Sequence, residues 1–429
     1  MKVLSTKKDK INDIKLILEP KFFDESSEIS NIVKKIISDV KTGGDETILT
    51  LGKKFDSKKL TSLKVTEEEI DKSYDQISPN LLNAIKTAKN NIYNFHKKQL
   101  QNSWFETFDN LIYGQIVKPI EKVGFYAPGG LAPYPSTVLM TAIPGIIAGV
   151  KQLVMTAPAQ KETGNIHPAM LVAARECNIT DIFKIGGAQA VAALAFGTDL
   201  VPKVDKIVGP GNTFVAEAKR QLFGYVGIDQ MAGPSEILVI CDKTANPSFV
   251  AADMLSQAEH AEDSRCVVIT TCRELAEKII KELEIQTKSA LRKEMIQKSL
   301  DSNGTIIIAN NEEEACELSN VFAPEHLELQ TKNPWDTLKL IKNAGTIMLG
   351  HYTPVPVCDF AAGPNHTLPT MGTARFSSAL GVDDYIKKSG ILSFTQKGLE
   401  EISQTGITIA EAEGFEAHAN TIKIRTKGK

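Results

Sequence analysis

Short apolar runs alternate with helical stretches from about Ile116 onward, and this alternation restricts the possible fold more than any other feature. The runs predict buried strands, and the intervening stretches carry apolar residues at helical spacing. The predicted strands are Gln152–Thr156, Ile182–Ile185, Lys206–Val208, Glu236–Cys241, Cys266–Thr271 and Thr305–Ala309, and the predicted helices are Ala188–Phe196, Ala216–Phe223, Ser248–Gln257 and Glu274–Leu283. This order predicts an α/β protein with parallel sheets, whose ligands bind at the carboxyl ends of the strands.

The first hundred or so residues are predicted to be helical. Apolar residues between Ile29 and Val40 repeat at the period of one helix face, and Gly43-Gly44 marks a stop. Thr66 with Glu69 resembles a capping box, and Ser78-Pro79 begins another helix. This region carries no pattern that indicates a catalytic or ligand-binding site.

The charge balance and the apolar segments limit the possible partners. The chain has 49 basic and 52 acidic residues and a net charge of −3, without a long basic block, so nucleic acid is not expected as a partner. Met1–Lys8 lacks the apolar segment of a signal peptide. The longest apolar stretch, Thr137–Val150, contains Pro144 and is too short to span a bilayer. We therefore expect a cytoplasmic protein with a small-molecule substrate and no membrane contact.

The six cysteines show no C-x2-C pair and no regular spacing, which argues against a zinc ribbon or a disulfide framework. Reduced, mostly structural thiols are the expectation. Cys358 is the exception to consider, because it directly precedes Asp359 in a candidate site.

Four of the seven histidines lie in polar clusters rich in carboxylates. These clusters are Gln257–His260, Pro324–His326, Asp359 with Gly363–His366, and Glu413–His418. A single histidine in a turn is usually only solvated or hydrogen-bonded. Imidazole, however, ligates metals and moves protons near neutral pH, and nearby carboxylates fix its tautomer. The four clusters together therefore predict one site.

Gln257 and His260 stand three residues apart at the end of a predicted helix, so both side chains can share a cation. Asp359 and His418 could complete four nitrogen and oxygen ligands, a set that suits zinc or a neighbouring divalent ion. Glutamine is an unusual zinc ligand, so ligand type alone supports this hypothesis weakly.

Glu325 and His326 place a carboxylate beside an imidazole, after the helix that ends before Pro324. Such a pair suits general acid/base work, although an exposed Glu-His turn is an equal alternative on this segment alone. Ser235 precedes a predicted strand and either contacts a substrate or caps a turn.

Three glycine-containing loops follow strand-like runs and are candidates for binding a cofactor. They are Gly124–Gly130, Gly186–Gln189 and Val208–Asn212. None matches G-x-G-x-x-G or a Walker P-loop, so tight structural turns explain them equally well.

Eight motifs occur in order along the chain: VGFYAPGG, GGAQAVAALAFGT, VDKIVGPGN, AGPSE, LSQAEH, APEHLE, DFAAGPNHTLPT and EGFEAHANTIKIR. Together they resemble the histidinol dehydrogenase family over nearly the whole chain. The resemblance implies a zinc- and NAD-dependent, four-electron oxidation of L-histidinol through the aldehyde to L-histidine. This reaction reduces two NAD and is the last step of histidine biosynthesis.

The resemblance also implies a role for each matching residue. His326 would take the alcohol proton, and Glu325 would activate water for attack on the aldehyde. The implied zinc ligands are Gln257, His260, Asp359 and His418, and the substrate-binding residues are these four with Ser235, His326, His366 and Glu413. The implied NAD-contacting residues are Tyr126, Gln189 and Asn212. In this family the single zinc of each subunit mainly anchors the substrate.

The implied fold has two incomplete Rossmann-like domains, similar to those of aldehyde dehydrogenases, with small N- and C-terminal helical modules. The expected boundaries are an N-terminal extension over 1–25, a metal-carrying and catalytic domain over 26–112 with 236–380, an NAD-contacting domain over 113–235, and a C-terminal module over 381–429. The family forms homodimers in which this module reaches the partner's site, so His418 and Glu413 would act across the dimer.

Four other interpretations remain open from the sequence. A family relative could oxidise a different amino alcohol or a diol. A zinc hydrolase would use Glu325 to activate a metal-bound water, and an aldehyde dehydrogenase would use Cys358 or Cys266 as nucleophile. A non-catalytic binding protein is the fourth, and the intact ligand and base positions argue against it.

Overall fold

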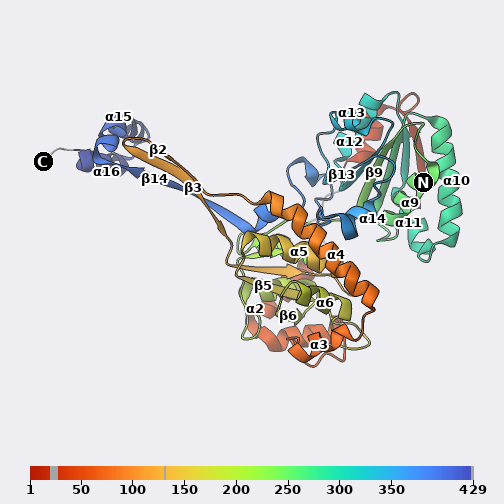
Figure 1. The fold of residues 1–429 in the computed structure, drawn as a ribbon, viewed down its shortest axis with the longest axis horizontal. Helices are drawn as coiled ribbons and strands as arrows, with labels where there is room; N and C mark the ends of the chain where they lie inside the picture. Colours follow the sequence, from red (N-terminus) through yellow and green to blue (C-terminus); the bar gives the residue numbers. More distant parts are fainter. Residues whose placement is uncertain (20–27, 130–131, 427–429) are drawn as a thin grey trace. The chain divides into compact units, whose positions relative to one another are not determined.

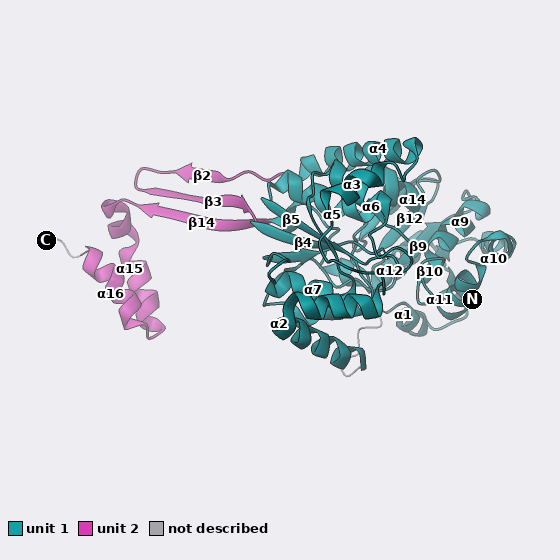
Figure 2. Ribbon diagram, turned by 90° about the horizontal axis from the view of Figure 1, so that it is seen from below, with its two compact units in different colours: residues 1–99, 121–385 teal, residues 100–120, 386–429 magenta. Residues whose placement is uncertain are grey.

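The computed structural model describes residues 1–19, 28–129 and 132–426. Its contacts divide the chain into two compact units, coloured teal and magenta in Figure 2. Unit 1 consists of Met1–Gln99 and Glu121–Tyr385, and unit 2 of Leu100–Ile120 and Ile386–Lys429. Gly130 of the first predicted loop and residues 20–25 of the predicted extension lie outside the described residues. Within the described ranges, the helices lack the length and apolar character needed to cross a membrane.

Unit 1 contains a five-stranded parallel sheet built from residues 122–228 (Figure 1). Its order is β6 (Asp181–Lys184), β5 (Gln152–Ala157), β4 (Lys122–Tyr126), β7 (Lys206–Val208) and β8 (Gly227–Ile228). The chain runs outward from β4 through β5 to β6 and then returns to β7 beside β4. The switch point between β4 and β7 is where an open sheet of this kind binds ligands.

Seven helices pack around this five-stranded sheet. Four lie within its sequence: α5 (Pro135–Ala148), α6 (Pro168–Glu176), α7 (Gly187–Phe196) and α8 (Thr213–Leu222). Three come from the N-terminal region: α2 (Glu28–Phe55), α3 (Glu67–Tyr74) and α4 (Pro79–His96). Helix α2 packs on α7 and α8, α3 on α6, and α4 on α5. These contacts join residues 28–96 to the 113–235 segment, and α4 also packs on residues 358–362. The predicted domain boundaries remain predictions.

The N-terminal helices begin and end at the signals expected from the sequence. Thr66 and Glu69 form a complete capping box at α3, and the Ser78 side chain accepts from the Leu81 N–H at the start of α4. The apolar repeat that begins near Ile29 lies in α2, which is interrupted at Gly44 with φ +51°. This backbone conformation favours glycine, so the predicted stop is a break within one long helical segment.

Unit 1 also contains a six-stranded parallel sheet. Its order is β1 (Lys2–Ser5), β11 (Thr305–Ile308), β10 (Arg265–Thr270), β9 (Glu236–Cys241), β12 (His326–Gln330) and β13 (Thr346–Leu349). The helices of this lobe are α1 (Ile11–Leu18), α9 (Pro247–Ala258), α10 (Arg273–Ser289), α11 (Lys293–Asn303), α12 (Glu312–Phe322), α13 (Pro334–Leu338) and α14 (Val355–Val357). Residues of the predicted N-terminal extension thus supply an edge strand as well as a helix.

Strand β9 shows why the apolar runs of this lobe are continuous. Ile237 and Val239 pack into the core beneath α9 and α10, whereas Leu238 and Ile240 pack into the core beneath α1 and α12 (Figure 1). Successive side chains point to opposite faces, and helices cover both faces. All predicted strands and helices of the α/β region are present in the structure.

Unit 2 is a small separate module. Strands β14 (Ile386–Phe394), β3 (Leu111–Pro119) and β2 (Trp104–Thr107) form an antiparallel sheet, and helices α15 (Gln396–Ala412) and α16 (Glu416–Thr426) pack on each other. Polar and apolar side chains alternate along Thr421–Arg425, but this segment is helical and lies within α16. The module also takes in residues 100–120, because β14 needs β3 as its partner.

Candidate active site

Three predicted residues, Ser235, Glu325 and His326, meet at the amino end of the six-stranded sheet. His326 is the first residue of β12 and pairs with Ile237 of β9, so Glu325 and His326 lie beside Ser235 and Glu236. Glu325 and His326 are buried and Ser235 is partly buried. The alternative of an exposed Glu-His turn is therefore excluded, because strand pairing draws His326 into the sheet.

The His326 ring is held between two acceptors. Its Nδ1 lies 3.0 Å from the carbonyl oxygen of Glu236, and its Nε2 lies 3.3 Å from Oδ1 of Asp359. Burial by itself lowers the pKa of His326, but the charges of Glu325 and Asp359 and their hydrogen bonds outweigh burial and raise it well above the usual value. The arrangement thus favours a proton on this ring.

The Glu325 carboxylate is fixed by the neighbouring strand. Its Oε2 accepts a hydrogen bond from the backbone N–H of Glu236 at 2.8 Å and lies 3.5 Å from Nδ1 of His326. The side chain of Glu236, which the sequence analysis did not single out, lies 3.2 Å from Nη1 of Arg265. Burial raises the pKa of Glu236 to about 7, although Arg265 lowers it. Its position directly after Ser235 was the signal that could have identified it.

Asp359 and His366 contact each other after α14. Asp359 lies in a π-helical turn, Cys358–Ala362, and its carbonyl oxygen lies 3.0 Å from Nδ1 of His366. Nε2 of His366 lies 3.1 Å from Oγ1 of Thr137 on α5, a contact that the sequence did not indicate. Burial lowers the pKa of His366, which favours the neutral ring.

The last turn of α9 brings two more predicted residues to this end of the sheet. Gln257 is buried, and its backbone carbonyl oxygen accepts a hydrogen bond from the backbone N–H of His260 at 3.2 Å. The His260 side chain is exposed. Burial raises the pKa of Asp359, but the hydrogen bond with His326 and the charges of His326, His366 and His260 outweigh burial and lower it. One amide, one imidazole and one carboxylate of the predicted ligand set belong to unit 1.

The other two predicted residues belong to unit 2. Glu413 follows α15, His418 lies on α16, and both side chains are exposed. Among the described residues, no group of three or more His, Cys, Asp or Glu side chains is arranged to hold a metal ion. Unit 1 contains three residues of the predicted ligand set. Asp359 and His260 are of the four residue types just named, and the third is Gln257.

The three residues predicted to contact NAD lie at the carboxyl edge of the five-stranded sheet. Tyr126 ends β4, Gln189 lies in the first turn of α7, and Asn212 precedes α8 after β7. The loop after β7 passes close to β4 at Gly209, where φ is +105° and a Cβ would lie 2.4 Å from the carbonyl oxygen of Tyr126. This close approach requires glycine and places the loop at the switch point.

Each of these three side chains has a different local role. Tyr126 Oη accepts from the Gly187 N–H at 3.3 Å, and burial raises the pKa of Tyr126 to about 12. Asn212 caps α8 by accepting from two backbone N–H groups at 3.1 Å. The buried Nε2 of Gln189 has no hydrogen-bond partner among the described residues. An unsatisfied buried donor at a switch point fits a ligand with polar acceptors.

A partly buried carboxyl group supports the loop at Gly186. Asp56 Oδ2 accepts from the backbone N–H of Gly186 at 3.0 Å, and burial raises the pKa of Asp56 to about 6. No motif in the sequence marked this residue, because its partner is 130 positions away.

The cysteines do not resemble nucleophiles. Cys266 donates to the carbonyl oxygen of Met254, and burial raises the pKa of Cys266 to about 12. Burial also raises the pKa of Cys358. Both sulfurs therefore remain thiols near neutral pH, which argues against the aldehyde dehydrogenase mechanism.

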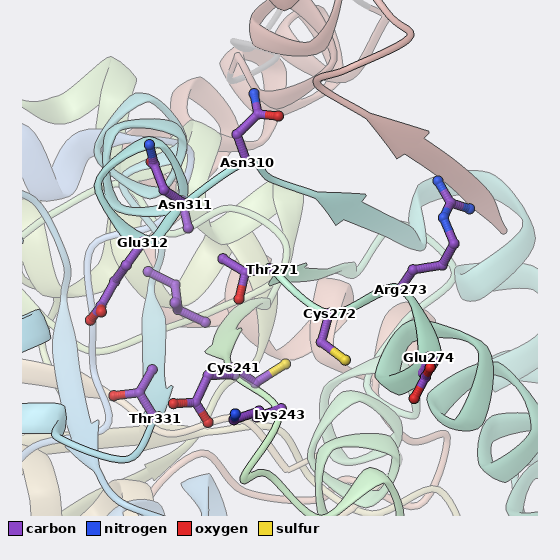
Figure 3. A pocket seen from close by; sticks show the side chains of 13 residues that line it. Cys241, Lys243, Thr271, Cys272, Arg273, Glu274, Asn310, Asn311, Glu312 and Thr331 are labelled. Carbon is purple, nitrogen blue, oxygen red and sulfur yellow. The ribbon is translucent and has the colours of Figure 1, made fainter.

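A cavity of about 720 Å³ lies at the opposite, carboxyl edge of the six-stranded sheet (Figure 3). Its labelled side chains come from the end of β9 and from the segments after β9, β10, β11 and β12, and they include Cys272, Arg273 and Asn311. The predicted site residues within the described part of the chain are absent from its lining. This cavity therefore does not coincide with the predicted catalytic residues, which lie at the amino end of the same strands.

Comparisons with known proteins agree with the resemblance in sequence. The family model described as histidinol dehydrogenase matches residues 21–426. Histidinol dehydrogenase from Clostridium acetobutylicum is 50% identical over 404 residues, 94% of each chain, and that from Geobacter metallireducens is 48% identical over 406 residues, 94% of this chain and 93% of the other.

Solved structures give the same result for the fold. The crystal structure of histidinol dehydrogenase from Elizabethkingia anophelis matches with a TM-score of 0.94 at 38% identity, covering 100% of this chain and 98% of that one. An acetylating aldehyde dehydrogenase from Geobacillus thermoglucosidasius matches with a TM-score of 0.50 at 14% identity, covering 87% and 99%. The second likeness concerns the fold alone, and it confirms the predicted aldehyde-dehydrogenase-like architecture.

Proposed function

This chain belongs to the histidinol dehydrogenase family, and from that premise we propose how its residues oxidise L-histidinol. It is an NAD-dependent oxidoreductase of histidine biosynthesis. The overall reaction converts the alcohol to the aldehyde and the aldehyde to L-histidine, with two NAD reduced. The observation that carries the residue assignment is the buried pair Glu325 and His326, held between the backbone of Glu236 and Asp359.

His326 acts as the base in the first oxidation. The substrate hydroxyl gives its proton to Nε2 of His326 while a hydride leaves the same carbon, so an aldehyde forms. The contact of Nδ1 with the carbonyl oxygen of Glu236 keeps the proton on Nδ1 and leaves Nε2 as the acceptor.

Glu325 acts in the second half of the reaction. Its carboxylate takes a proton from water as the water oxygen bonds to the aldehyde carbon. The aldehyde oxygen takes the proton that His326 gained in the first oxidation, which gives the hydrated aldehyde. Loss of a second hydride and of a hydroxyl proton then gives the carboxylic acid. The hydrogen bond from the Glu236 N–H fixes one oxygen of Glu325 and leaves the other for the water.

When bound, NAD supplies the hydride acceptor, and zinc supplies a positive charge that anchors the imidazole and amino nitrogens of the substrate. Gln257, His260 and Asp359 of unit 1 would hold the metal, and their amide, imidazole and carboxylate donors fit its preference for nitrogen and oxygen ligands. With Asp359 bound to a cation, less negative charge acts on His326, so its pKa falls toward the value a base needs.

We also propose that the protein is a homodimer in which His418 and Glu413 of the partner subunit complete the site with a fourth ligand and a substrate contact. This accounts for the position of both residues in a separate unit with exposed side chains. Unit 2 also leaves Trp104, Phe105 and Leu392 exposed, as expected of a surface that another subunit covers. The cytoplasmic location remains a prediction.

The test is NADH formation from L-histidinol, with a diol that lacks the imidazole as control. We expect two NADH per L-histidinol, loss of turnover on chelation, and recovery with zinc. Equal turnover of the diol would instead indicate a relative with another substrate. Turnover that resists complete removal of zinc would overturn the metal assignment.

A further inference from the structure

Three polar side chains are buried directly beneath the site. They are Asp253 on α9 and Glu328 and Gln330 on β12, and each is at most 6% exposed. Nε2 of Gln330 donates to Asp253 Oδ2 at 2.8 Å and to Glu328 Oε2 at 2.7 Å. Burial is the main cause that raises the pKa of both Asp253 and Glu328, and for Glu328 the charge of Asp253 raises it further, which favours a proton on this pair of carboxyl groups. We call these three side chains the carboxyl brace.

The carboxyl brace joins three separate segments of the chain. Glu328 Oε1 accepts a hydrogen bond from the backbone N–H of Val355, the first residue of α14, at 3.0 Å. Through Asp253 the same group reaches α9. Strand β12, helix α9 and the start of α14 therefore meet at one set of hydrogen bonds.

Each of these segments carries a residue of the proposed site at a short, regular spacing. Glu328 lies two residues after His326 on β12, so both side chains point to the same face of the sheet. Asp253 lies four residues before Gln257 on α9, one helical turn away on the same face.

The third segment follows the same rule. Val355 lies four residues before Asp359, and the helical turn of α14 continues directly into the π-helical turn that carries Asp359. A displacement of Val355 would therefore be transmitted to Asp359.

Stability alone does not explain such a group. Replacing a buried polar network by apolar side chains of similar volume is often neutral or stabilising, so an apolar core would serve a purely structural purpose equally well. Oε1 of Gln330 has no hydrogen-bond partner among the described residues, but Nε2 of Gln330 and Oε1 of Glu328 are paired. Such hydrogen bonds hold the three segments at one set of distances, as outer-shell partners do for metal ligands.

We propose that the carboxyl brace fixes the positions of His326, Gln257 and Asp359 relative to one another, and so sets the geometry of the base and the metal ligands. This inference rests on the proposed function. Its members are positioning residues, since they act through the groups above them. They are a determinant of metal affinity and of the alcohol-oxidation step.

The experiment compares three variants of the full-length protein. Glu328→Leu removes the acceptor of Val355 and the partner of Asp253. Glu328→Gln keeps an oxygen acceptor and a donor without charge. Leu329→Ala is the matched control, because Leu329 is buried on the same strand and packs into the core on the opposite face. Urea unfolding measures the stability of each variant.

The readouts are zinc affinity by competition with a chelator, kcat and KM for L-histidinol, and amide hydrogen exchange of residues 358–362. We expect Glu328→Leu to lose on the order of 10- to 100-fold in zinc affinity and to exchange faster in residues 358–362. In Glu328→Gln, zinc affinity and the exchange rate of residues 358–362 should return most of the way to the wild-type values. Leu329→Ala should leave both near the wild-type values even though it is less stable.

Zinc affinity and exchange in Glu328→Leu that equal the wild type would overturn the inference. The inference would also be overturned if zinc affinity and protection from exchange fell in proportion to the loss of stability in all three variants. Such a result would show a structural role only. Wild-type protein that neither binds zinc nor oxidises L-histidinol would overturn the proposed function alone. Amide hydrogen exchange of residues 358–362 would then still test whether the carboxyl brace holds Asp359 in position.

Discussion

Nε2 of His326 lies 3.3 Å from Oδ1 of Asp359, so the proposed base and a proposed metal ligand are in direct contact. The charge state of one therefore depends on the other. The negative charge of Asp359 contributes to the raised pKa of His326, and a cation held by Asp359 would oppose this effect.

Replacing His326 by glutamine should lower kcat for histidinol oxidation by roughly 10²- to 10⁴-fold, because the alcohol proton loses its acceptor. Steady-state NADH formation measures the effect. His351→Gln is the control, since His351 lies outside the predicted site and contacts Thr244. A kcat close to wild type in His326→Gln would reject the assignment of the base.

Replacing Glu325 by glutamine should affect the two halves of the reaction unequally. Activation of water requires the carboxylate, whereas removal of the alcohol proton does not, so oxidation of added aldehyde should fall more than oxidation of the alcohol. Single-turnover measurements with each substrate separate the two steps. Equal losses in both would argue against a role specific to water.

Replacing Gln189 by alanine should raise the KM for NAD by about fivefold, since a hydrogen bond of this kind contributes on the order of 1 kcal/mol. KM for L-histidinol should not change. Gln221→Ala, on α8 of the same lobe, is the control, because the Gln221 amide is paired with Ser30 and Glu217. An unchanged KM for NAD in Gln189→Ala would remove this residue from the cofactor site.

Asp56 predicts a pH-dependent stability. Because its folded-state pKa is about 6, above the usual value of 3.8, the folded protein binds this proton more tightly than the unfolded chain does. The free energy of unfolding therefore falls as the pH rises from about 4 to 6, by an amount on the order of 3 kcal/mol.

Asp56→Asn imitates the protonated carboxyl group and can still accept from the Gly186 N–H. It should gain little stability at pH 4 and most above pH 6, as measured by urea unfolding across this range. The same gain at every pH would show that ionisation of Asp56 is not the cause.

Replacing Cys358 by alanine should leave substantial turnover. The thiol is buried with a raised pKa, and no step of the proposed mechanism uses it. Loss of all activity in a variant that still folds, judged by its circular dichroism, would favour a covalent aldehyde dehydrogenase mechanism instead.

Local patterns in the sequence were sufficient for much of the fold. The capping box at Thr66 and the continuous apolar run of β9 follow from residues that are neighbours in the chain, and such signals survive folding. The grouping of residues 28–96 with the five-stranded sheet was not predictable in this way. Helical periodicity shows that a helix has an apolar face but not which sheet that face covers.

The same division applies to the site. The sequence by itself determined which residue types gather in polar clusters and, through its motifs, the family. Only the tertiary structure placed Glu236, Thr137 and the carboxyl brace beside them. The reason is physical: the contacts of Glu236, Thr137 and Asp253 join residues 77 to 229 positions apart, and their energies depend on burial that arises only when sheets and helices pack together.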